Sequence, residues 1–111
     1  MNVAEKKKKL IKLLHEKTVA KSLDWDIVSP GESVSIWLAG RNIMLSSGEN
    51  ENGEPMEIVS IYNNNGDFVE SIDDEMFSGK PDFSDEENYW KAMRATRSLA
   101  YRQALGAAVE Q

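Results

Sequence analysis

The chain has no cysteine, one histidine and three prolines among its 111 residues. Without cysteine it can form no disulfide, no thiolate metal site and no thiol nucleophile. The only imidazole, His15, has no second histidine to complete a dyad or a metal site, so we interpret it as a solvated or boundary residue of a helix. Walker, GxGxxG, GxSxG and HExxH motifs are also missing. These absences predict that the protein is not an enzyme and has no catalytic residue, cofactor or metal ion.

Long apolar runs are lacking as well. Uncharged stretches such as Ser33 to Gly40 are far shorter than the roughly 20 residues that a membrane-spanning helix needs. The basic run Lys6 to Lys9 is followed by a segment that Lys12 interrupts, unlike the apolar part of a secretory signal. We therefore expect a cytoplasmic protein without membrane contact. With 41% apolar and 29% charged residues, the composition is that of a single folded domain spanning residues 1–111.

The charges that are present divide the chain into three parts. Residues 1–21 carry seven lysines against two acids, and residues 88–111 carry four basic groups against one acid. Residues 49–87 carry thirteen acids against one lysine, which gives this part a net charge of −12. The basic ends would attract nucleic acid, but the acidic middle would repel it, so direct nucleic-acid binding is not expected.

Two segments have the apolar period of an amphipathic helix. Within residues 4–21, the positions that recur at a spacing of three to four are Leu10, Leu13, Leu14 and Thr18. The second segment runs from Ser84 to about Ala108, and Ser84 with Glu87 matches a capping box at its start. Arg97 lies within the apolar stripe of this second helix, so its guanidinium must either reach solvent or meet a buried acid.

Between these helices the apolar period changes to two, which predicts five short strands. They are centred on Leu23-Asp24-Trp25-Asp26-Ile27, Val34 to Leu38, Ile43-Met44-Leu45, Met56 to Tyr62 and Phe68 to Ile72. Turn residues separate them at 29–32, 39–42 and 63–67, and residues 48–55 are predicted to form an exposed loop. The order of elements predicts an α+β fold, in which an antiparallel five-stranded meander is flanked by N- and C-terminal helices packed on one face.

The three tryptophans are expected to occupy different environments. Trp25 from the sheet and Trp90 from the second helix are predicted to anchor the core. Trp37 points away from its apolar neighbours Ile36 and Leu38, which leaves it on the uncovered face of the sheet. An indole in that position is typical of a protein–protein hot spot, although a cross-strand packing role accounts for it equally well.

The acidic segment between the last strand and the second helix is another candidate interaction site. Residues 73–85 contain several acids, Gly79 and Pro81 but few apolar residues, which predicts a loop. If the acidic surface binds a partner, we expect the contacts to involve Asp73, Asp74 and Glu75.

Several short runs occur together in this chain. They are Leu13 to Thr18, Leu23-Asp24-Trp25, Asn65-Gly66-Asp67, Val69-Glu70 and Ala100 to Gly106. In combination they resemble a recurrent type of small uncharacterised bacterial and phage α+β protein, with a helix, an LxW strand, an antiparallel meander and a C-terminal helix. The resemblance implies the same fold and an association with phages or mobile elements, and it implies no activity.

Three functions are compatible with these features. The leading hypothesis is a non-enzymatic protein-binding module that docks a protein partner through Trp37 or through residues 73–87. One alternative is an acidic inhibitor that mimics DNA in the positively charged groove of a nucleic-acid enzyme or defence complex. The other is a small-molecule pocket between the second helix and the sheet. Because an open sheet leaves one face and two edges bare, we also expect a homodimer.

Overall fold

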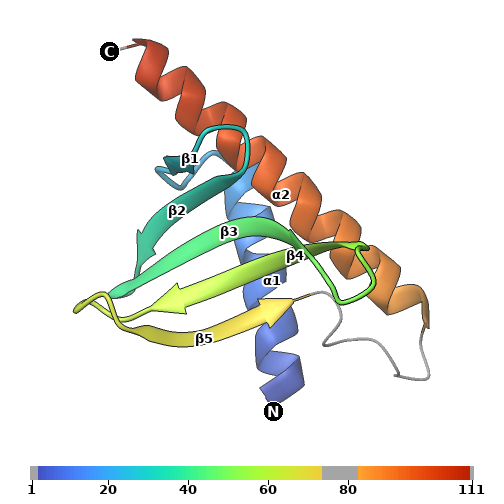
Figure 1. Cartoon of the computed structure of the whole chain (residues 1–111). Helices are drawn as coiled ribbons and strands as arrows, with labels where there is room; N and C mark the ends of the chain where they lie inside the picture. Colours follow the sequence, from blue (N-terminus) through green and yellow to red (C-terminus); the bar gives the residue numbers. More distant parts are fainter. Residues whose placement is uncertain (1–2, 74–82, 111) are drawn as a thin grey trace.

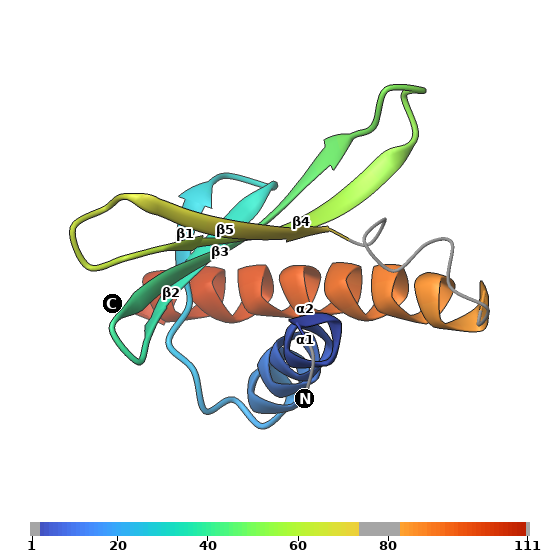
Figure 2. The same ribbon diagram turned by 90° about the horizontal axis from the view of Figure 1, so that it is seen from below.

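The computed structural model describes residues 3–73 and 83–110, which form two helices and one sheet (Figure 1). The elements are α1 (Val3–Val19), β1 (Asp26–Ser29), β2 (Ser33–Leu38), β3 (Arg41–Glu49), β4 (Pro55–Tyr62), β5 (Phe68–Asp73) and α2 (Phe83–Glu110). The strands lie in sequence order, and each neighbouring pair is antiparallel. Both helices lie on one side of the sheet (Figure 2). The predicted α+β fold and five-stranded meander are confirmed.

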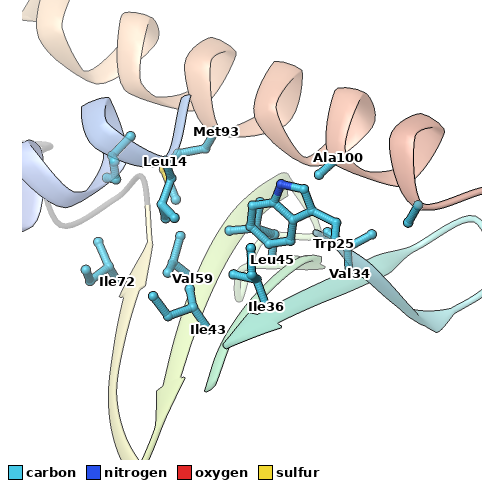
Figure 3. Packing of buried hydrophobic residues seen from close by; sticks show 12 residues of the cluster. Leu14, Trp25, Val34, Ile36, Ile43, Leu45, Val59, Ile72, Met93 and Ala100 are labelled. Atoms are coloured by element: carbon cyan, nitrogen blue, oxygen red, sulfur yellow. The ribbon is translucent and has the colours of Figure 1, made fainter. Parts of the chain in front are cut away.

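The core lies between the sheet and the two helices (Figure 3). Val34, Leu45 and Val59 stand opposite one another on the three central strands, and they are almost completely buried. The helices supply the buried apolar residues Ile11, Leu14, Met93, Ala100 and Ala104. Strand residues therefore alternate between this core and the opposite face of the sheet, as the period of two predicts.

The helix α1 buries a stripe that differs from the predicted one by one position, with Ile11 in place of Leu13. Ile11, Leu14 and Thr18 are buried, whereas Leu13 is 40% exposed. The prediction that Leu13 faces the core is wrong, because buried positions spaced by three and four residues from Ile11 leave Leu13 on the adjacent, solvated side. At its end, α1 closes in a Schellman motif: Lys21 has a φ of 58°, and the Ser22 amide donates to a carbonyl of the last turn at 3.0 Å.

The first strand begins later than predicted. β1 starts at Asp26, so Leu23 and Trp25 belong to the connection between α1 and the sheet. Trp25 is nevertheless a core residue with 4% of its surface exposed, and its indole N–H donates to the buried Thr18 hydroxyl at 3.2 Å. The alternation of apolar residues in this segment thus reflects burial of the connection and not strand pairing.

The second predicted tryptophan anchor has a different environment. Trp90 is half-buried and does not belong to the buried cluster, and the guanidinium carbon of Arg94 lies 5.2 Å from the centre of its ring. The prediction that Trp90 anchors the core is therefore wrong. Its helix α2 begins at Phe83, one residue before the predicted cap at Ser84. In the described part of the chain, no helix has the length and apolar character that crossing a membrane requires.

Two of the hairpins are closed by the same kind of turn. Residues 50–54 join β3 to β4 and residues 63–67 join β4 to β5, with the sequences NENGE and NNNGD. In each turn the first asparagine accepts two amide hydrogen bonds at 2.9 or 3.0 Å, and the glycine has a positive φ of 77° or 85°. Because this turn needs only five residues, the predicted loop at 48–55 is shorter than expected, and Gly48, Glu49 and Pro55 pair in the ladder.

The hairpin between β2 and β3 contains a residue whose replacement should stabilise the protein. Ala39 and Gly40 form a two-residue turn in which both have positive φ, 54° and 76°. A residue with a Cβ atom costs roughly 1–2 kcal/mol in this conformation, which asparagine tolerates better. We expect Ala39→Asn to raise the free energy of unfolding in urea by about 0.5–1 kcal/mol. Gly40→Ala should lower it, and a less stable Ala39→Asn variant would contradict the turn described.

Candidate functional site

The sheet has one face that neither described helix covers (Figure 2). Residues paired in an antiparallel ladder point to the same face, so the register defines which side chains lie there. We name this surface the open face. Its residues are Asp26, Ser35, Trp37, Asn42, Met44, Ser46, Gly48, Met56, Ile58, Ser60, Tyr62, Phe68, Ser71 and Asp73.

One row of the open face carries three aromatic side chains. The ladder places opposite one another Trp37 of β2, Asn42 of β3, Tyr62 of β4 and Phe68 of β5. The rings of Tyr62 and Phe68 meet edge to face with their centroids 5.9 Å apart. Trp37 is 57% exposed and Phe68 is 60% exposed. The prediction that Trp37 lies on the uncovered face is confirmed, and two further aromatic residues share its row.

The open face is depleted in charge. Among the described residues, its members on β2, β3 and β4 include no charged side chain, although 29% of the whole chain is charged. Its two charged residues, Asp26 and Asp73, lie on the edge strands β1 and β5. The centres of protein interfaces are depleted in charge and enriched in aromatic residues and methionine. Met44 and the aromatic row give the open face this composition.

Both edges of the sheet resist pairing with another strand. β1 has four residues, contains a bulge and precedes Pro30. β5 also has an irregular register, and it carries Glu70, whose carboxylate lies 2.9 Å from the Lys7 ammonium group of α1. Short edge strands, bulges and charges near the edge all discourage strand addition. Both edges are therefore poor sites for the addition of another strand.

On the covered side of the sheet, an ion pair holds α2 against β4. The Arg97 guanidinium donates to both carboxylate oxygens of Glu57, at 2.7 and 3.1 Å, and to the carbonyl of Glu32 at 3.0 Å. The Glu57 side chain is 5% exposed and that of Arg97 is 17% exposed. Of the two outcomes expected for Arg97, the structure shows the second, a buried acid. Because the two groups bind each other, they connect the helix to the sheet.

His15 connects the two helices. Its Nδ1 atom lies 2.9 Å from the Thr96 hydroxyl, and this hydroxyl donates to the carbonyl of Ala92 at 2.7 Å. Since a hydroxyl has only one proton to donate, Nδ1 of His15 carries the proton that it shares with Thr96. The half-buried imidazole is a boundary residue, as predicted. Among the residues that the structure describes, no group of three histidine, aspartate or glutamate side chains is placed to hold a metal ion.

Acidic side chains gather at the end of the sheet opposite the aromatic row. A hollow of about 450 Å³ is lined there by Glu49, Asn50, Glu51, Asn52, Met56 and Asp73. Of the three acids predicted to contact a partner, Asp73 belongs to this hollow, whereas Asp74 and Glu75 lie outside the described residues. The hollow adjoins the β3–β4 turn, and it does not lie between α2 and the sheet, where the small-molecule hypothesis expects a pocket.

Comparison with protein-family models, with curated proteins and with solved structures finds no match to this chain. Any function must therefore be inferred from the geometry of the molecule itself. Its two distinctive surfaces are the uncharged open face with its aromatic row and the acidic hollow at the other end of the strands.

Proposed function

We propose that this chain is a non-enzymatic, cytoplasmic protein-binding module, of the kind that phages or mobile elements carry, and that it binds a protein partner through the open face. The observation that carries this proposal is the absence of charge on the described central strands of the open face, combined with two aromatic side chains that are more than half exposed. Such a surface is unusual for a protein that contacts only water.

The open face is also suited to binding because it is rigid. Each of its strands pairs with a neighbour through the ladder, so the backbone under Trp37 and Phe68 is ordered before a partner arrives. A partner then has to immobilise only side chains, which lowers the entropic cost of association. Burying a tryptophan at the centre of a dry interface commonly contributes 2 kcal/mol or more, on the order found for hot-spot residues.

Two contacts support the proposal that the protein is not an enzyme. The only imidazole is shared between the helices through Thr96, and the Arg97 guanidinium is bound by Glu57 and by a backbone carbonyl. Groups of this kind can act as acids, bases or anion binders when they face a substrate. In this chain their contacts assign them to holding α1, α2 and β4 together.

A matched pair of substitutions tests the proposed function. Trp37 and Val19 are both apolar and both 57% exposed, but Trp37 lies on the open face whereas Val19 ends α1. With the partner identified by purification from the source cells and then isolated, we expect Trp37→Ala to weaken binding by about 2 kcal/mol or more in calorimetry. Val19→Ala should bind as the parent does. Equal affinity for the two variants would contradict binding through the open face.

The acidic hollow favours a second candidate function, the DNA-mimicking inhibitor. Glu49, Glu51 and Asp73 converge at one end of the sheet, where they would suit a positively charged groove. In that case, neutralising Asp73, Asp74 and Glu75 together should slow association and flatten its dependence on salt, and Trp37→Ala should have little effect. Association rates measured at low and moderate ionic strength separate the two candidates.

A further inference from the structure

We infer that the partner on the open face is a second copy of this chain, so that two sheets stack face to face about a two-fold axis. This inference rests on the proposed function, because it uses the same surface, and it commits that surface to one occupant. Closed two-fold dimers are the commonest assembly of small soluble proteins, and their interface must be complementary to itself. The open face meets this requirement in its charge, its area and the spacing of its aromatic residues.

Charge is the first reason. Two copies with a net charge of −6 each repel one another wherever their acidic surfaces approach. The central strands of the open face can meet a second copy without bringing like charges together, because Asp26 and Asp73 lie only on the edge strands. The acidic hollows of the two copies would lie at one end of this dimer, beyond the uncharged centre of the interface. A basic partner, in contrast, would find on the central strands no acidic side chain to bind.

The area is the second reason. Four strands spaced by about 4.8 Å and about seven residues long cover roughly 450 Å² of flat surface per copy. Side-chain relief makes the accessible area larger than this flat area, so two copies together clear the roughly 1,000 Å² expected of a specific interface. An edge-to-edge dimer would bury much less, and the bulges of β1 and β5 already oppose it.

The spacing of the aromatic row is the third reason. A two-fold axis parallel to the strands, between β3 and β4, places β2 opposite β5 of the second copy and β3 opposite β4. Trp37 then faces Phe68 of the second copy, and Tyr62 faces Asn42 of the second copy. By symmetry, each of these contacts occurs twice in the dimer. In the next row the small side chains of Ser35, Ser60 and Ser71 leave room for two sheets to approach to about 10 Å.

Sedimentation equilibrium on the full chain tests the inference. We expect a monomer–dimer equilibrium whose dimer does not weaken as salt rises, because salt screens the repulsion between two negative copies. Trp37→Ala should weaken the dimer at least about 30-fold, the equivalent of a hot-spot truncation. Val19→Ala, with the same exposed fraction, should dimerise as the parent does.

A pair of charged variants tests the geometry. Trp37→Lys and Phe68→Glu should each be monomeric. A two-fold dimer of either variant would bury the new charge twice, once from each copy, without an opposite charge beside it. Mixed together they should form a heterodimer, in which Lys faces Glu at one contact and the native Trp37 faces the native Phe68 at the other. Circular dichroism and urea midpoints close to those of the parent establish that both variants are folded.

The opposite results are equally clear. A single 12.5 kDa species up to high micromolar concentration, a dimer that survives Trp37→Lys, or charged variants that do not rescue each other would each overturn the inference. A monomer that still binds a different protein through Trp37 would leave the proposed function intact. A monomer that binds another protein equally well with and without Trp37 would contradict both the dimer and the proposed function.

Discussion

Replacing Trp25 by alanine is expected to lower the free energy of unfolding by about 3–5 kcal/mol. The indole is 4% exposed, and Figure 3 shows it between α2 and the strand residues Val34, Ile36 and Leu45. Removing it opens a cavity in the core, and it removes the hydrogen bond that the indole N–H donates to the Thr18 hydroxyl. Since small domains are stable by only about 5–15 kcal/mol, the variant should be partly unfolded at room temperature.

Urea denaturation of three variants checks this expectation. Trp25→Phe should lose less stability than Trp25→Ala, because it keeps a ring in the core but gives up the bond to Thr18. Trp37→Ala should change the free energy of unfolding by less than about 1 kcal/mol, because that indole is 57% exposed. A Trp25→Ala variant as stable as Trp37→Ala would contradict the burial of Trp25 in the core.

The substitution Arg97→Met should destabilise the protein by a similar amount, about 3–5 kcal/mol. It leaves the Glu57 carboxylate 5% exposed without the guanidinium that donates to both of its oxygens. A buried carboxylate that loses its counter-ion costs more than the net contribution of the pair, because it has already lost most of its contact with water. Glu32 also loses the donor to its backbone carbonyl.

The double variant Arg97→Met with Glu57→Leu separates this mechanism from a simple loss of packing. With both charges replaced by apolar side chains of similar size, most of the stability lost by Arg97→Met should return. Thermal or urea unfolding of the parent, the two single variants and the double variant gives the coupling energy. A double variant less stable than Arg97→Met alone would contradict the role assigned to this pair.

The fold was predictable because its signals are local. Strand period, turn residues and two amphipathic segments determine the order of elements, and a meander needs no long-range information beyond that order. The errors concern residues whose environment depends on distant contacts. Trp25 lies outside a strand because Thr18 and α2 bury the connection, and Leu13 is exposed because α1 turns Ile11 and Leu14 toward the core. Trp90 is half-buried although it falls on an apolar helical stripe.

The candidate site was predictable only in part. Trp37 was identified because it interrupts the alternation of its own strand, which is a local signal. Tyr62 and Phe68 lie far from it in sequence, and only the register of β2 through β5 brings the three into one row. Counting pairs outward from the turns at 39–40 and 63–67 gives the pairs Trp37–Asn42 and Tyr62–Phe68. Joining the two pairs requires the tight turn at 50–54, where the sequence predicted a longer loop at 48–55.

The depletion of charge on the open face also required the register. In the sequence, the charged residues of the strand region are frequent, and nothing local shows that those of the central strands avoid one face. Glu57 illustrates the point, because its neighbours in sequence face the open side while its own carboxylate lies inside with Arg97. A one-residue change of register would reverse this arrangement.

Hydroxyl-radical footprinting tests most directly whether the open face is a protein interface. The chain is oxidised alone at nanomolar concentration, and again at high micromolar concentration or with its isolated partner. We expect Trp37, Tyr62 and Phe68 to be oxidised when the chain is dilute and protected together in the assembled state, while the exposed helix residues Leu13 and Leu105 react equally in both. Protection of the helix residues with continued oxidation of Trp37 would contradict the account.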